Sequence, residues 1–178
     1  MKKILLALSA VAALLLTTAC GSGSAEEKKA ASSLAEAWNG ADASAARKAS
    51  NTCIAKKWTA AVGTDQLVKD KIVDKNFRAI GQAPPDKMSK SVAKAFGNAV
   101  ADCFDVKSMK DDLKKSMAGL DDKTVNAYIS CMDAIDRDLI AQAVADGKTS
   151  PTGKLTKPMT DLQTVVKACQ DKVPTQTQ

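Results

Sequence analysis

The sequence predicts an all-α fold, an irregular bundle of five or six helices held together by two disulfides. Three observations predict it. Ala, Lys and Leu, which favour helices, are frequent, and 31 of the 178 residues are Ala. Residues that start and stop helices recur along the chain. No two runs of alternating β-branched residues are joined by a hairpin turn.

A single helical domain is expected over residues 42–173, with a modest core. The predicted helices span residues 42–63, 64–81, 86–103, 108–119, 121–146 and 158–173. In the second of these, Val73, Phe77 and Ile80 recur at helical spacing. Ser108 is the expected cap of the fourth. The fifth is expected to be the longest and to end at Gly147.

The first twenty residues are typical of an export signal. Two lysines precede a largely apolar stretch of 13 residues, 4–16, which is shorter than the about 20 residues of a membrane-spanning helix. The sequence TTAC at residues 17–20 then resembles the lipobox of bacterial lipoproteins, with Thr17 in place of the commoner Leu. The resemblance implies a signal peptide over residues 1–19, an acylated Cys20 and a lipid anchor at the outer face of the cell membrane. The alternative is a plain secretory signal that leaves Cys20 as a free thiol.

Residues 20–41 are expected to form the lipidated N-terminus and a flexible tether, because residues 21–31 are polar or small and show no apolar periodicity. Trp38 lies in this segment and is a candidate contact residue for a partner or for lipid headgroups. Residues 174–178 are expected to be a frayed tail.

Four cysteines remain besides Cys20, and in an exported protein an even number indicates two disulfides. Three pairings are possible. We favour Cys53–Cys103 with Cys131–Cys169, because each half of the chain then has the same arrangement. In each half a long helix with a cysteine is followed by an irregular segment and by a last helix with a second cysteine. A zinc site is the alternative, but the spacings include no Cys-x-x-Cys pair.

The segment Thr52–Leu67, in which a cysteine is followed by a short helical stretch, a glycine and a leucine, resembles an element of small helical lipoproteins of actinobacteria. The cysteines at 103 and 131 lie in similar helical surroundings. This resemblance implies recurring helical hairpins and supplies no functional residue.

Charge and composition exclude several function classes. The chain after residue 19 has 24 basic and 20 acidic residues, a net charge of +4, and only three of the basic residues are Arg. This balance is unlike that of a nucleic-acid-binding protein, so no nucleic-acid partner is expected. The absence of histidine excludes Ser-His-Asp catalysis and histidine-based zinc sites. No cofactor and no metal is predicted.

Two constellations could support hydrolysis. Ser91 and Lys94 match the Ser-x-x-Lys pattern of penicillin-binding enzymes, and Lys148-Thr149 is similar to their Lys-Thr element, but that element requires a strand. Pairs of carboxylates are the second candidate site, because glycan hydrolysis uses one protonated and one ionised acid. The candidate acids are Asp111, Asp112, Asp121, Asp122, Asp133, Asp136 and Asp138. Helix capping and surface pairing explain their positions equally well.

The sequence therefore predicts a lipid-anchored envelope protein whose helical domain binds another envelope protein or an apolar small molecule, without catalysis. A hydrolase acting on the cell wall, through the Asp carboxylates or the Ser/Lys pair, and a passive structural spacer are the alternatives. A binding module should have a concave apolar cleft or patch, whereas an enzyme should have converging polar groups with perturbed pKa values.

Overall fold

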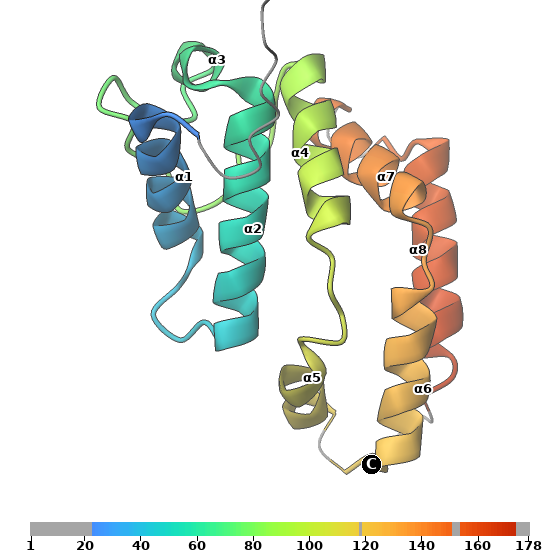
Figure 1. Ribbon diagram of the computed structural model, residues 1–178. Helices are drawn as coiled ribbons and strands as arrows, with labels where there is room; N and C mark the ends of the chain where they lie inside the picture. Colours follow the sequence, from blue (N-terminus) through green and yellow to red (C-terminus); the bar gives the residue numbers. More distant parts are fainter. Residues whose placement is uncertain (1–22, 118, 151–153, 174–178) are drawn as a thin grey trace, which may run out of the picture.

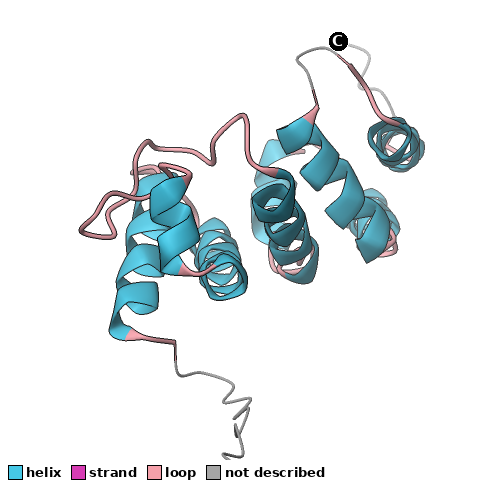
Figure 2. Cartoon of the chain, turned by 90° about the horizontal axis from the view of Figure 1, so that it is seen from above, coloured by secondary structure: helices cyan, strands magenta, loops and turns pink. Residues whose placement is uncertain are grey.

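The computed structural model describes residues 23–117, 119–150 and 154–173. Within these ranges the chain is all-helical, with one isolated β-bridge between Val73 and Ala79. Figures 1 and 2 show the helices and the loops that join them. The helices are α1 (Ala25–Trp38), α2 (Ala45–Val62), α3 (Thr64–Lys69), α4 (Lys90–Asp102), α5 (Lys110–Ser116), α6 (Asp122–Asp133), α7 (Arg137–Thr149) and α8 (Lys157–Gln170).

The helices form two groups that meet where α4 packs against α7. Helices α1 to α4 enclose the larger core, and the end of α4 together with α5 to α8 encloses two smaller clusters. In Figure 1, α1 and α2 lie on one side of α4, and α7, α8 and α6 lie on the other. The two helices approach closely because α4 has no side chain at the buried Gly97, which lies against the backbone of Ala141.

Both predicted disulfides are confirmed. Cys53 and Cys103 have Cα atoms 5.8 Å apart, and Cys131 and Cys169 have Cα atoms 5.6 Å apart, both within the usual range for a disulfide. One bridge joins α2 to the end of α4, and the other joins α6 to α8. Each bridge therefore lies within one of the two groups of helices.

The segment predicted as a tether contains a helix. Ser24 and Glu27 form a complete capping box at the start of α1, with the Ser24 hydroxyl accepting from the Glu27 amide at 3.0 Å. Four residues of α1 are buried in the main core: Ala30, Ala31, Leu34 and Ala35. The sequence does not show the buried face of α1 clearly, because three of these four residues are alanines, whose weak hydrophobicity barely marks a helix face.

The helix predicted from residue 64 to 81 is wrong beyond Lys69. Ile72 and Val73 are buried, but the chain there forms an irregular loop that extends to Ser89. The Asp74 carboxylate accepts from the amides of Asn76 and Arg78, both at 2.8 Å. Such a local side-chain turn competes with helical hydrogen bonding. The loop buries Val73 and part of Phe77, but it leaves Ile80 exposed, so the apolar spacing does not mark a helix face here.

The long helix predicted from 121 to 146 is interrupted. Helix α6 ends at Asp133, and the Asp136 side chain caps α7 by accepting from the Asp138 amide at 2.8 Å. Helix α7 then continues past Gly147 to Thr149. The predicted cap of α5 is also wrong, because the Ser108 hydroxyl donates to the Asp105 carbonyl instead. The helices at 42–63, 86–103 and 158–173 are confirmed with shifted ends.

Candidate functional site

A groove of about 570 Å³ lies between α2 and α4. Its sides are formed by residues three or four positions apart on each helix, which therefore share one face. Helix α2 contributes Lys57, Ala60 and Ala61, and α4 contributes Ser91, Lys94, Ala95, Asn98, Ala99 and Asp102. Four of the nine are alanines, two on each helix, and the polar side chains are Lys57 on the α2 rim and Ser91, Lys94, Asn98 and Asp102 on the α4 rim. Sequence analysis identified only Ser91 and Lys94 among these residues.

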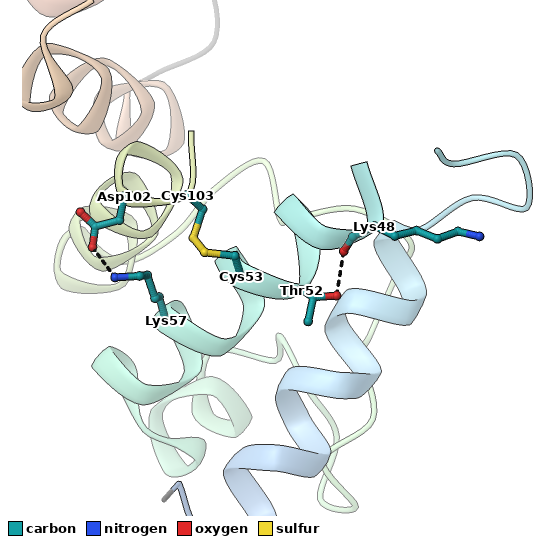
Figure 3. The surroundings of a disulfide bond; sticks show 6 residues. All are labelled: Lys48, Thr52, Cys53, Lys57, Asp102 and Cys103. Atoms are coloured by element: carbon teal, nitrogen blue, oxygen red, sulfur yellow. Dashed lines mark hydrogen bonds and ion pairs between the residues drawn. A yellow bond between two sulfur atoms is a disulfide. The ribbon is translucent and has the colours of Figure 1, made fainter. Parts of the chain in front are cut away.

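A disulfide and an ion pair join α2 to α4 at one end of the groove (Figure 3). Cys53 is bonded to Cys103, and one turn further along α2 the Lys57 ammonium lies 2.9 Å from the Asp102 carboxylate. Both charged side chains are more than half exposed, at 51% and 58%, so their pairing contributes little stability. The covalent bridge therefore sets the spacing of the two helices at this end.

An aromatic cluster supports the same two helices from the core. Trp58 of α2 is fully buried, and its indole NH donates to the Val92 carbonyl of α4 at 3.1 Å. The Trp58 and Phe96 rings are 4.9 Å apart, edge to face, an arrangement that adds to the apolar burial. The groove is thus built on a rigid pair of helices.

Trp38 belongs to this cluster. Its ring lies 5.8 Å from that of Trp58 and 6.2 Å from that of Phe96, and it is partly buried against the main core. Helix α1 carries it there, and the Asn51 amide donates to the Trp38 carbonyl at 3.3 Å. Trp38 therefore packs in this cluster, and its contact with a partner or with lipid headgroups stays a prediction.

The Ser/Lys pair lies in the groove. Ser91 and Lys94 are on successive turns of α4, and both are exposed. Lys148 also comes close to the start of α4, because its carbonyl accepts from the Met88 amide at 2.9 Å. Lys148 and Thr149 form the last turn of α7, however, and not a strand. The Lys-Thr element required for penicillin-type chemistry therefore has helical geometry in this chain.

The candidate carboxylates are engaged in ion pairs and caps. Asp133 lies 2.7 Å from the Lys107 ammonium and 3.5 Å from the Arg137 guanidinium. The hydrogen bond from Lys107 lowers the pKa of Asp133 and raises the pKa of Lys107. Asp122 is paired at 2.8 Å with Lys114, whose hydrogen bond lowers the pKa of Asp122. A general acid needs the opposite shift, toward a raised pKa.

The other candidate acids occupy helix starts. Asp121 caps α6, and the hydrogen bond from the Thr124 amide lowers the pKa of Asp121. Asp136 caps α7, and Asp138 lies in its first turn. Asp111 and Asp112 lie in the first turn of α5, and Asp112 accepts from the Ser44 hydroxyl. These positions favour the structural interpretation of the acids, because carboxylates complement the positive end of a helix.

Cys20, the predicted lipidation site, lies outside the described residues. Among the residues that the structure does describe, no three His, Cys, Asp or Glu side chains are grouped as metal ligands would be. None of the described helices combines the length and the hydropathy required to cross a bilayer. Comparisons of the chain with protein-family models, with curated proteins and with solved structures found no match.

Proposed function

We propose that this chain is a lipid-anchored envelope protein whose helical domain binds a segment of another envelope protein in the α2/α4 groove. Residues 1–19 act as the export signal, and Cys20 carries the acyl anchor. The two disulfides support the export step, because such bridges form and persist in oxidising compartments. The lipobox-like residues 17–20 support the acylation.

The groove is the observation that carries the binding proposal. Its four alanines let the backbone of a partner helix or peptide approach closely, and its polar side chains, most of them on α4, supply hydrogen-bonding groups. An apolar small molecule would stay exposed in it, since Ser91, Lys94 and Asn98 on one rim are all exposed. A protein segment is therefore the better fit.

Site-specific photo-crosslinking in the native membrane tests the binding proposal. We expect a crosslinking amino acid at Ala61, in the groove, to form one defined adduct, and the same amino acid at the exposed Ala127 of α6 to form none. Ala60→Trp, which fills the groove, should abolish the adduct, whereas Ala127→Trp should not. An adduct that survives Ala60→Trp would contradict binding in the groove.

A hydrolase is the second candidate function, and it is favoured by the position of Ser91 and Lys94 in the groove. Ser91→Ala and Lys94→Gln separate the two functions. If the groove only binds, the natural chain should form the Ala61 adduct and take up no fluorescent penicillin at Ser91. Labelling of Ser91 by a fluorescent penicillin, lost in either variant, would instead establish the enzyme. A passive spacer would show neither the adduct nor the label.

Acylation is tested separately by metabolic labelling with palmitate. The label should appear in the natural chain and be absent from Cys20→Ser. Globomycin, which blocks lipoprotein signal processing, should cause the unprocessed precursor to accumulate. A natural chain that carries no palmitate would contradict the anchor.

A further inference from the structure

The two ends of the domain differ in charge. Residues 64–94, which form α3, the loop after it and the first turns of α4, contain seven basic and four acidic residues, a net charge of +3. Residues 103–125, which include α5 and the start of α6, contain five basic and five acidic residues, a net charge of 0. In Figure 1, α3 and the start of α4 lie at the upper end, and α5 and the start of α6 lie at the lower end.

The chain enters the domain at the basic end. Figure 1 shows α3 beside the first turns of α1, and Figure 2 looks down onto this end of the molecule. Helix α1 begins at Ala25, directly after the capping box of Ser24 and Glu27. Only three residues separate Cys20 from Ser24, and the four steps between them span at most about 14 Å. An acyl anchor on Cys20 therefore cannot hold the domain far from the bilayer.

We propose that the basic end of the domain, α3 with the loop to α4, lies against anionic phospholipid headgroups, and that the neutral end, α5 with the start of α6, points away from the membrane. The proposal rests on the acylation of Cys20 proposed above. It adds an orientation and a lipid contact to that anchor.

Two physical effects favour the same orientation. The short connection holds the start of α1 at most about 14 Å from the lipid surface, so the basic end can come within the screening length of about 8 Å at physiological ionic strength. Within that range an anionic surface attracts the basic end, whereas the neutral end is not attracted. A connection of about twenty residues, as the tether prediction implied, would place the domain beyond most of this field.

The test uses the full acylated chain, reconstituted in vesicles that carry a nitroxide quencher on their headgroups. Mass spectrometry first verifies the acyl chains on Cys20. A fluorophore is then attached to Lys28→Cys in α1 or to Lys115→Cys in α5, two exposed positions at which each change removes one positive charge. We expect several-fold stronger quenching at position 28 than at position 115 in vesicles that contain phosphatidylglycerol.

Two variants test the two effects that favour this orientation, the short connection to Cys20 and the charge of the basic end. Insertion of a Gly-Ser segment of about twelve residues after Gly23, which adds a reach of about 20 Å, should reduce the difference between the two probes. Removal of three exposed positive charges from the basic end should reduce it further: Lys75→Gln, Lys87→Gln and Lys90→Gln. The matched control removes three exposed positive charges elsewhere and should leave the difference unchanged: Lys48→Gln, Lys123→Gln and Lys172→Gln.

Three results would overturn the inference. The first is equal quenching of both probes in the acylated chain. The second is a difference that is the same in pure phosphatidylcholine vesicles, and the third is an equal effect of the two charge variants. A chain without acyl groups on Cys20 would overturn the proposed anchor itself, before any probe is read.

Discussion

Gly97→Ala tests the close packing of α4 against α7, where the two groups of helices meet. A Cβ atom at this position would lie 3.1 Å from the carbonyl carbon of Ala141 and 3.2 Å from the Cβ of Ala145, and would overlap the Ala141 oxygen. Carbon atoms pack at about 3.5–4.0 Å, so α4 and α7 must separate by about 0.5–1 Å. Overpacking of this kind costs about 1–3 kcal/mol. It acts against the gain of about 1 kcal/mol that alanine brings to a helix interior.

Gly147→Ala is the matched control, because it makes the same chemical change on α7 where the space is open. The new Cβ would meet only the Met159 Cε, at 4.0 Å. We expect this variant to gain up to about 1 kcal/mol and Gly97→Ala to lose stability. Thermal unfolding, followed by circular dichroism with the disulfides intact, measures the difference at about 2–4 °C per kcal/mol. A Gly97→Ala variant as stable as Gly147→Ala would refute the close approach of α4 and α7.

Three further predictions concern the core and the ion pairs. Replacing Cys53 and Cys103 with Ala should lower the free energy of unfolding by about 4 kcal/mol, because the lost bridge closes a separation of 50 residues; denaturant titration measures this, and an unchanged midpoint would contradict it. Trp58→Phe leaves a buried carbonyl of α4 without its donor, so it should cost about 1–3 kcal/mol in the same titration. Because the pKa of Asp133 is lowered in the fold, its ionised form stabilises the protein above the ordinary carboxyl pKa near 4, and this contribution is lost as the pH falls through the folded pKa. In Lys107→Gln the Asp133 titration midpoint, followed by carboxyl NMR, should rise toward the ordinary value; an unmoved midpoint would exclude Lys107 as the cause.

Part of the fold follows from local patterns in the sequence. The apolar face of α4 is marked by Val92, Phe96 and Ala99, and all three are buried. Gly63, with a φ of 80°, ends α2, because glycine adopts this backbone geometry without strain. The sequence also favoured the disulfide pairs, since each joins helices of one half of the chain.

Other elements were decided by packing. Helix α1 was missed because its alanines gain their burial only from contact with α2 and α3. Asp133 and Asp136 occur in a sequence that is compatible with one continuous helix, but Asp136 instead caps α7, which packs along α4. The groove was likewise not apparent, because its nine residues belong to two helices that are separated by the 70–89 loop in the chain.

The sequence by itself determined the helical class and most helix positions, because propensity and capping act between residues that are close in the chain. For the cysteines it only favoured one of three pairings, the one that the structure has. The tertiary structure alone decided which alanines are buried, where the long helix breaks, and that Ser91 and Lys94 face α2 across a groove. These properties depend on the distance between helices that are remote in sequence. The close approach at Gly97 and the bridge at Cys53 set that distance.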